Sequence, residues 1–398
     1  MSLLSIPAEL WLFAATLAAV AVFHRHTLGA ALAGLAAITV YKTALTGFKL
    51  GDGLAGLAGH FAHEWVLLAN LLLLLTGFAI LSRHFEESQV PAVMPNLLPD
   101  DWTGGLALLA MIFVMSAFLD NIAAAVIGGT VARSVFRGKV HIGYLAAIVA
   151  ASNAGGSGSV VGDTTTTMIW ISGVSPLHVL HAYVAAAVAF AVFAIPAARS
   201  QHRLQPIMKD AAPGTAIIPT RIAIVALILV GAITANVLAN LYRPDILDHV
   251  PLVGLAVWAA ILVALPLHAP DWPILPEAAK GSVFLLALVS AASMMPIESL
   301  PPASPSTALV LGFVSAVFDN IPLTALAIKQ GGYDWGYLAY AVGFGGSMIW
   351  FGSSAGVALS NLYPETKSVK AWVTAGWAIP LAYVVGFFVM HAVLGWSP

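Results

Sequence analysis

Two seven-residue strings, roughly 200 residues apart, read almost identically and place an acidic residue within apolar sequence. They are SAFLDNI at residues 116–122 and SAVFDNI at residues 315–321, and five of the seven positions are identical. A charged side chain at membrane depth costs about 2.5 kcal/mol or more, and usually marks an ion or proton pathway. Such a pair in two halves of a chain predicts an internal repeat with a site where the repeats meet. The alternative is that Asp120 and Asp319 serve only as helix N-caps.

The composition predicts an all-α polytopic membrane protein. Hydrophobic residues make up 60% of the chain and charged residues only 9%, with a mean hydropathy of +0.92. Soluble domains carry about 25% charged residues. The net charge of -2 gives no reason to expect a nucleic-acid partner. With no cysteine in the sequence, disulfides, thiolate metal sites and cysteine nucleophiles are excluded.

Several apolar segments are long enough to cross a bilayer, given that a span needs about 20 residues or somewhat fewer. The predicted spans are 8–23, 28–46, 65–82, 178–198, 219–241, 251–268, 280–297 and 371–395. Residues 47–64 are rich in glycine and predict an interfacial or re-entrant link. The polar residues 201–218 predict a cytoplasmic linker between a first half, 1–200, and a second half, 219–398.

The two strings lie at the centres of segments that do not resemble simple spans. Residues 103–136 and 303–331 are each long enough for two half-length helices, and each has charged residues near both ends. We expect each to form a helical hairpin with its tip near the middle of the membrane. Backbone can turn at that depth only where protein or a cavity surrounds it. A single tilted span through each aspartate remains the alternative.

Two further segments, 142–173 and 335–362, predict broken helices. They contain NAGGSGSVVGDTTTT at 153–167 and GFGGSMIWFGSSAG at 343–356. Glycines weaken a helix, and an unwound segment exposes carbonyl and hydroxyl oxygens to a bound ion. Aligning the two Gly-Gly-Ser triplets places Asp163 opposite Ser353, whereas the shared Met-Ile-Trp favours a different offset. Close helix packing is the alternative; it explains the glycines, but not Asp163 followed by four threonines.

The distribution of basic residues favours one topology, because cytoplasmic loops carry an excess of Lys and Arg. Twelve of the 16 are then cytoplasmic: Arg25, Arg83, Arg133, Arg137, Lys139, Arg199, Arg203, Lys209, Arg221, Lys280, Lys367 and Lys370. The other four, Lys42, Lys49, Arg243 and Lys329, lie outside. We therefore expect about eleven spans and an inverted repeat with re-entrant hairpins, located in a plasma membrane, or in the inner membrane of a Gram-negative cell.

Four of these patches resemble motifs of the NhaD-type sodium/proton antiporters of the ion transporter superfamily. They are DNI at 120–122, GDTTTTMIW at 162–170, DNIP at 319–322 and GSSAGV at 352–357. The superfamily also contains arsenite, citrate and dicarboxylate carriers. In the dicarboxylate carriers the hairpin tips read Ser-Asn-Thr, whereas both tips of this chain carry aspartate. The resemblance therefore implies cation exchange more than anion symport.

Cation exchange would need hard oxygen ligands such as carboxylates, hydroxyls and carbonyls. We expect one cluster of Asp120, Asn121, Ser116, Ser157, Asp163, Thr164 and Thr165, and a second of Asp319, Asn320, Ser315, Ser347 and Ser353. Sodium is expected at Asp120, Asn121, Asp163, Asp319 and Asn320. Cation and proton would compete for the same carboxylates. Because the second half has Ser353 where the first half has Asp163, we expect one charged exchange site and one weaker site. The negative C-terminal ends of the half-helices would assist.

Other features carry less weight. The pairs His60/His63 and His178/His181 have the spacing of metal ligands on a helix, but no third ligand of suitable spacing is evident. No phosphate-binding loop and no HExxH motif is present. We expect no cofactor.

Three functions follow in order of preference. The first is antiport of sodium or lithium against protons across the lipid bilayer. The second is transport of arsenite or a citrate-like carboxylate. The third, of a different class, is an intramembrane enzyme that uses Asp120 and Asp319 as an acid/base dyad. The sequence leaves the oligomeric state open, a homodimer included.

Overall fold

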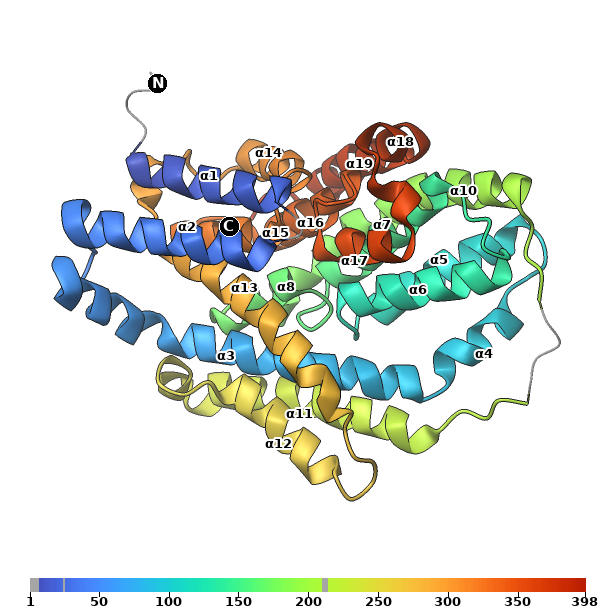
Figure 1. The fold of residues 1–398 in the computed structure, drawn as a ribbon, viewed down its shortest axis with the longest axis horizontal. Helices are drawn as coiled ribbons and strands as arrows, with labels where there is room; N and C mark the ends of the chain where they lie inside the picture. Colours follow the sequence, from blue (N-terminus) through green and yellow to red (C-terminus); the bar gives the residue numbers. More distant parts are fainter. Residues whose placement is uncertain (1–6, 24–25, 210–213) are drawn as a thin grey trace.

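The computed structural model describes residues 7–23, 26–209 and 214–398, and these fold into helices joined by short connections (Figure 1). Among these residues there is no β-strand, only an isolated bridge between Phe48 and Gly51. The all-helical class is thereby confirmed, and the long apolar helices are consistent with a polytopic membrane protein. Five segments are long and apolar enough to cross a membrane: Thr27–Thr46, Gly53–Glu87, Pro176–Leu204, Pro219–Tyr242 and Trp272–Ser293. A bent pair, Val369–Ala375 and Ala378–Leu394, makes a sixth, and the count of eleven stays a prediction.

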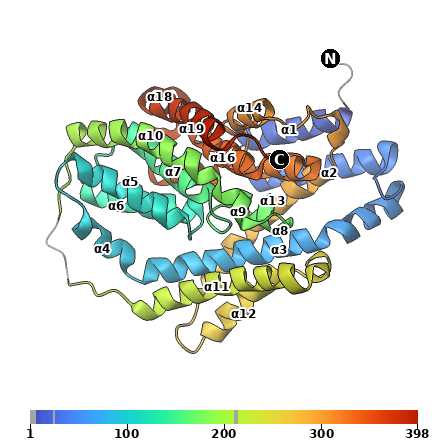
Figure 2. The ribbon, with the colours of Figure 1, turned by 180° about the vertical axis from the view of Figure 1, so that it is seen from behind.

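One set of helices, which we call the frame, takes three helices from each half of the chain. They are α1 (Ala8–Val22), α2 (Thr27–Tyr41), α3 (Gly53–Glu87), α11 (Pro219–Tyr242), α12 (Leu252–Ala264) and α13 (Leu275–Ser293). Helix α2 packs between α1 and α13, and α3 packs against α11, α12 and α13. Figures 1 and 2 both show α11 running alongside the long α3.

The second set, the core, contains the helices that follow the three frame helices in each half, apart from the connecting helix α4 (Val90–Leu97). From the first half come α5 (Trp102–Ser116), α6 (Asn121–Val135), α7 (Ile142–Ser157), α8 (Thr164–Ile171), α9 (Pro176–Leu180) and α10 (Ala182–Leu204). From the second come α14 (Pro305–Ser315), α15 (Asn320–Gln330), α16 (Trp335–Gly345), α17 (Ser354–Leu362), α18 (Val369–Ala375) and α19 (Ala378–Leu394). The remaining elements connect these helices. They are the short helix α4 and the turns η2 (Lys42–Thr46), η3 (Pro244–Asp248), η4 (Trp272–Ile274), η5 (Ile297–Ser299), η6 (Gly346–Met348) and η7 (Pro364–Lys367).

Helix α7 lies at the centre of the core. It packs against α5, α6, α10, α16, α17 and α18, and its residues from Gly143 to Ser157 are all buried. Many of these residues are Ala, Gly or Ser, and such small side chains let neighbouring helices approach closely in membranes. A polar side chain on α7 is therefore surrounded by other helices of the core.

The frame and the core meet along few elements. Helix α13 packs against α15, and α3 contacts α8, while α4 bridges α3 and α6. The order of elements in the first half recurs in the second: three frame helices, a helical pair, a helix with a break, and a closing helix. Because both groups draw on both halves, the two halves are interleaved in space.

Three predicted segments differ in the structure. The predicted link 47–64 is wrong beyond Asp52, because α3 begins at Gly53 and continues for 35 residues. Packing of α3 against other frame helices, including the hydrogen bond between His60 and Ser293 of α13, outweighs the weak helix propensity of the glycines there. The predicted span 371–395 is bent by 59° between α18 and α19. Helix α10 extends to Leu204, into the predicted linker, of which residues 210–213 lie outside the described residues, as does Arg25.

Candidate functional site

Four interruptions of helical structure share one pattern. A serine lies in the last turn before the interruption and a capping residue precedes the next helix, and all eight residues are buried or partly buried. In three of the four the serine is the last helical residue, whereas Ser347 lies within the turn η6 that follows α16. The pairs are Ser116 and Asp120, Ser157 and Asp163, Ser315 and Asp319, and Ser347 and Ser353. The offset is the same in the two helical pairs and the same in the two broken helices. This geometry agrees with the alignment of the Gly-Gly-Ser triplets, which places Asp163 opposite Ser353.

The aspartates of the repeated strings are helix N-caps. Oδ1 of Asp120 accepts the Ile122 N–H at 2.8 Å, and Oδ1 of Asp319 accepts the Ile321 N–H at 3.0 Å. The second oxygen of Asp319 accepts a hydrogen bond from the Ser354 hydroxyl at 3.3 Å. Both aspartates therefore cap helices through Oδ1, and that Asp120 and Asp319 serve only as caps stays an alternative.

Asp163 is the most deeply buried of the three, at 3% exposure. It caps α8, where its Oδ1 accepts from both the backbone N–H and the hydroxyl of Thr165, each at 3.2 Å. Its Oδ2 is buried and has no hydrogen-bond partner among the described residues, and the same holds for the Ser116 hydroxyl. An unpaired buried carboxylate oxygen is costly unless a cation or a proton compensates it.

Asn153 on α7 connects the two predicted clusters. Its Oδ1 accepts from the Asn121 amide at 3.0 Å. Its Nδ2 donates to the hydroxyls of Ser347 at 2.9 Å and Ser353 at 3.1 Å. The first hairpin tip is thus hydrogen-bonded through Asn153 to the break in the second half. The prediction of two clusters omitted this residue, although an amide two residues before a Gly-Gly-Ser triplet on an apolar helix is a usable signal.

Two glycines allow each hairpin tip to approach a helix break. A Cβ at Gly162 would meet the carbonyl oxygen of Ser116, and one at Gly352 would lie 2.6 Å from that of Ala316. Neither position can hold a larger residue without moving backbone. The glycine-rich sequence is therefore required for close approach, in addition to interrupting the helix.

A cavity of about 590 Å³ lies between the frame and the core. On the core side it is lined by Asp120, Asn121, Asp163, Thr164, Asn320 and Ser354. On the frame side α3 and α13 line it, with Arg83, Glu86 and Glu277 the charged residues among them. Both hairpin tips and Asp163 therefore face one cavity.

The other predicted ligands lie behind the cavity wall. Ser315 donates to the Val342 carbonyl at 2.7 Å and Ser157 to the Ala154 carbonyl at 2.8 Å. Ser347 and Ser353 are held by Asn153, as described above. Of the predicted residues, five therefore line the cavity, whereas the predicted serines and Asp319 are not among the residues that line it; the five are Asp120, Asn121, Asp163, Thr164 and Asn320.

The histidine pairs do not form a metal site in the part of the chain that the structure describes. No group of three or more His, Asp or Glu side chains there could hold a metal ion. His60 instead bonds the Ser293 hydroxyl at 3.0 Å. The three aspartates do not form such a group either, so a cation at this cavity would also need hydroxyl, amide or carbonyl oxygens.

Comparison with known proteins gives two relatives, both from Arabidopsis thaliana. The chain is 26% identical over 320 residues to "Sodium/proton antiporter 1", an alignment that covers 70% of this chain and 54% of the relative. It is 24% identical over 331 residues to "Sodium/proton antiporter 2", covering 73% of this chain and 76% of the relative. The chain thus spans about half the length of the first relative. No family model matches the chain.

Proposed function

We propose that this chain is a secondary transporter that exchanges sodium or lithium ions for protons. The observation that supports this most directly is the buried, unpaired Oδ2 of Asp163 beside a cavity that Asp120 also lines. A cation or a proton satisfies that oxygen, and each excludes the other. The similarity to two proteins named as sodium/proton antiporters supports the same function, as do the motifs that resemble the NhaD-type antiporters.

The second hairpin tip completes the site in this proposal. Asp319 holds its place as the cap of α15 and receives the Ser354 hydroxyl, while Asn320 lines the cavity beside it. A cation entering the cavity meets amide and carboxylate oxygens from both halves of the chain. One site made by both halves replaces the two sites expected from the sequence.

In this proposal, ions enter from the end of the cavity that the charged residues Arg83, Glu86 and Glu277 line. The charge distribution predicts that this end is cytoplasmic. At the predicted outer end, Lys49 and Glu298 form an ion pair at 3.0 Å, and α13 packs against α15. Alternating access then requires the frame and the core to move relative to each other, so that the α13–α15 contact opens.

The alternatives are weaker on chemical grounds. A citrate-like anion would meet carboxylates in the cavity, and an enzyme dyad is not suggested by relatives that are both named as transporters. The deciding experiment uses proteoliposomes with a pH dye in the lumen and sodium, lithium, citrate or arsenite added in turn. We expect an inward gradient of sodium or lithium to alkalinise the lumen, because protons leave as the ions enter. An outward gradient should acidify it. A signal with citrate or arsenite but not with sodium would refute the proposal.

The predicted topology can be tested because the chain contains no native cysteine. Cysteines at positions 137 and 203 should react with an impermeant thiol reagent from the cytoplasm, and those at 243 and 329 from outside. This follows from the excess of basic residues on the cytoplasmic side. Labelling of positions 137 and 329 from the same side would eliminate the inverted repeat.

A glycine beside Asp163 gives a prediction about the size of the ion site. A Cβ at Gly343 would lie 3.2 Å from Oδ2 of Asp163. In Gly343→Ala we expect the added methyl group to take space from the ion and to lower apparent sodium affinity by about tenfold, a loss typical of disturbed ion sites. The measurement is the sodium dependence of flux.

Gly281→Ala is the matched control for that substitution. Gly281 also lines the cavity, but a Cβ there meets nothing within 4 Å. It should leave the sodium affinity unchanged. Equal effects of the two substitutions would show that the cation does not bind beside Asp163.

A further inference from the structure

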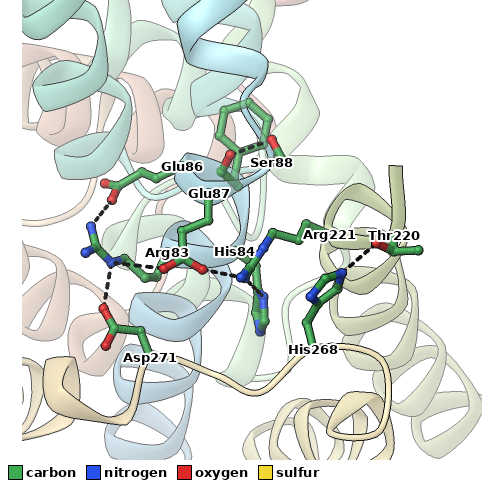
Figure 3. A network of polar contacts seen from close by, with 10 residues as sticks. Arg83, His84, Glu86, Glu87, Ser88, Thr220, Arg221, His268 and Asp271 are labelled. Carbon is green, nitrogen blue, oxygen red and sulfur yellow. Dashed lines mark hydrogen bonds and ion pairs between the residues drawn. The ribbon is translucent and has the colours of Figure 1, made fainter. Parts of the chain in front are cut away.

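A network of charged side chains surrounds the end of α3 at the cavity mouth (Figure 3). Arg83 pairs with Glu86 at 2.7 Å and with Asp271, in the connection between α12 and α13, at 2.8 Å. Arg83 and Glu86 also line the cavity. This end of α3 therefore forms part of the cavity wall, at the end where the proposed function places ion entry.

His84, the residue after Arg83, belongs to the same network on the side of α11. Its Nδ1 lies 3.1 Å from Nη1 of Arg221, and the residue is 2% exposed. An arginine can only donate hydrogen bonds, so Nδ1 of His84 must accept. The contact therefore exists only while His84 is neutral with Nδ1 unprotonated.

The charges around His84 determine what a proton would do there. Arg221 faces it from α11 and His268 from the α12–α13 connection, while Glu87 lies on α3 itself. Glu87 already forms an ion pair with Arg221. Asp271 is engaged by Arg83, and α4, which packs beside α3, carries no charged residue. A protonated His84 would place a second cation against Arg221 in a buried position, and the hydrogen bond between them would be lost.

We propose that His84 and Arg221 form a proton-sensitive latch that holds α11 to the cavity end of α3. The latch is closed in the structure, where the cavity reaches Asp163. Because protonation of His84 opposes the closed latch, it also opposes this state of the cavity by linkage. Acidification on this side then reduces access to the cavity, separately from competition between protons and sodium at the aspartates.

The first test measures access without transport. Ser82 lines the cavity, so Ser82→Cys gives a single reporter in a chain with no other cysteine. Its rate of labelling by a small thiol reagent is measured in detergent at about pH 6 and pH 8, the range in which histidines titrate. The comparison is made with His84→Gln, whose amide oxygen accepts from Arg221 but takes up no proton. The introduced thiol itself reacts faster at higher pH, but this effect is the same with and without His84→Gln and therefore cancels in the comparison.

We expect the pH 6 to pH 8 ratio of labelling rates to be about threefold higher with His84→Gln, because the latch then stays closed in acid. His268→Gln, which removes the histidine bonded to Thr220 at 2.7 Å, should behave like the parent. If His84→Gln does not yield folded protein, His84→Asn, with a shorter amide, takes its place. Equal ratios in parent and variant would refute the latch.

The second test rests on the proposed function and uses sodium-driven flux in proteoliposomes. Sodium is kept saturating, so that proton competition at the aspartates is suppressed. The pH of half-maximal flux should move lower by roughly one unit in His84→Gln. An unmoved pH profile would contradict the latch. If even the parent protein carries no sodium-driven flux, the proposed function fails, while the labelling comparison still decides the latch.

Discussion

Asp163→Asn should abolish sodium-driven proton exchange while leaving folded protein in the membrane. Asparagine keeps the volume and one oxygen that can accept from Thr165, but it cannot ionise or release a proton. A unit charge about 4 Å from an ion contributes about 4 kcal/mol at an effective dielectric constant of 20, which is roughly a thousandfold in affinity. Asp120→Asn and Asp319→Asn should act in the same direction. The measurement is pH-dye flux in proteoliposomes at equal protein density.

Asp334→Asn is the matched control for these substitutions. Asp334 is also a buried helix N-cap, accepting the Gly336 and Tyr337 N–H groups of α16 at 3.0 and 3.2 Å, but it does not line the cavity. It should retain exchange. In the unsubstituted chain, apparent sodium affinity should fall as pH falls, because protons then occupy the shared carboxylates. Undiminished exchange in all three site variants would refute the mechanism.

Asn153→Ala should have the second-largest effect. It removes the acceptor of the Asn121 amide and the group that donates to Ser347 and Ser353, although Ser353 keeps its bond from the Gly356 N–H. Each buried polar group left unpaired costs about 1–3 kcal/mol. Because Asn153 holds groups around the site rather than supplying charge, we expect apparent sodium affinity to fall by about 10- to 100-fold with transport retained at high sodium.

Ser152→Ala separates that effect from general disturbance of α7. Ser152 is the neighbouring buried residue, and its hydroxyl donates to the Val149 carbonyl within the same helix. Its loss should lower thermal stability slightly and leave the sodium dependence of flux unchanged. Parallel changes in both variants would mean that Asn153 acts only through packing.

The sequence predicted the elements of the core more accurately than their arrangement. An aspartate between apolar residues indicates both a helix cap and an unusual polar position, and in the structure Asp120 is a cap that also faces a cavity. The glycine-rich segments predicted breaks, and the breaks occur between Ser157 and Asp163 and after Met348. These features are local, and local sequence determines them.

The features that sequence analysis missed depend on tertiary contacts. Asn153 acquires its role only because α7 lies between the two halves, so no pattern within 142–173 could give its partners. The clusters around Asp120 and Asp319 were predicted as separate because their common cavity is formed by α3 and α13 of the frame. The helical state of residues 53–64 was missed for the same reason, since packing there outweighs the propensity of three glycines.

The most direct test of the shared carboxylates is to count protons released when sodium binds. Purified protein in a weakly buffered detergent solution receives a sodium pulse, and a pH indicator records the change against an equal pulse of choline. Competition at Asp163 predicts that sodium releases protons, that the release saturates with sodium concentration, and that Asp163→Asn reduces it while Asp334→Asn does not. Sodium binding without proton release, or release that survives in Asp163→Asn, would contradict the account.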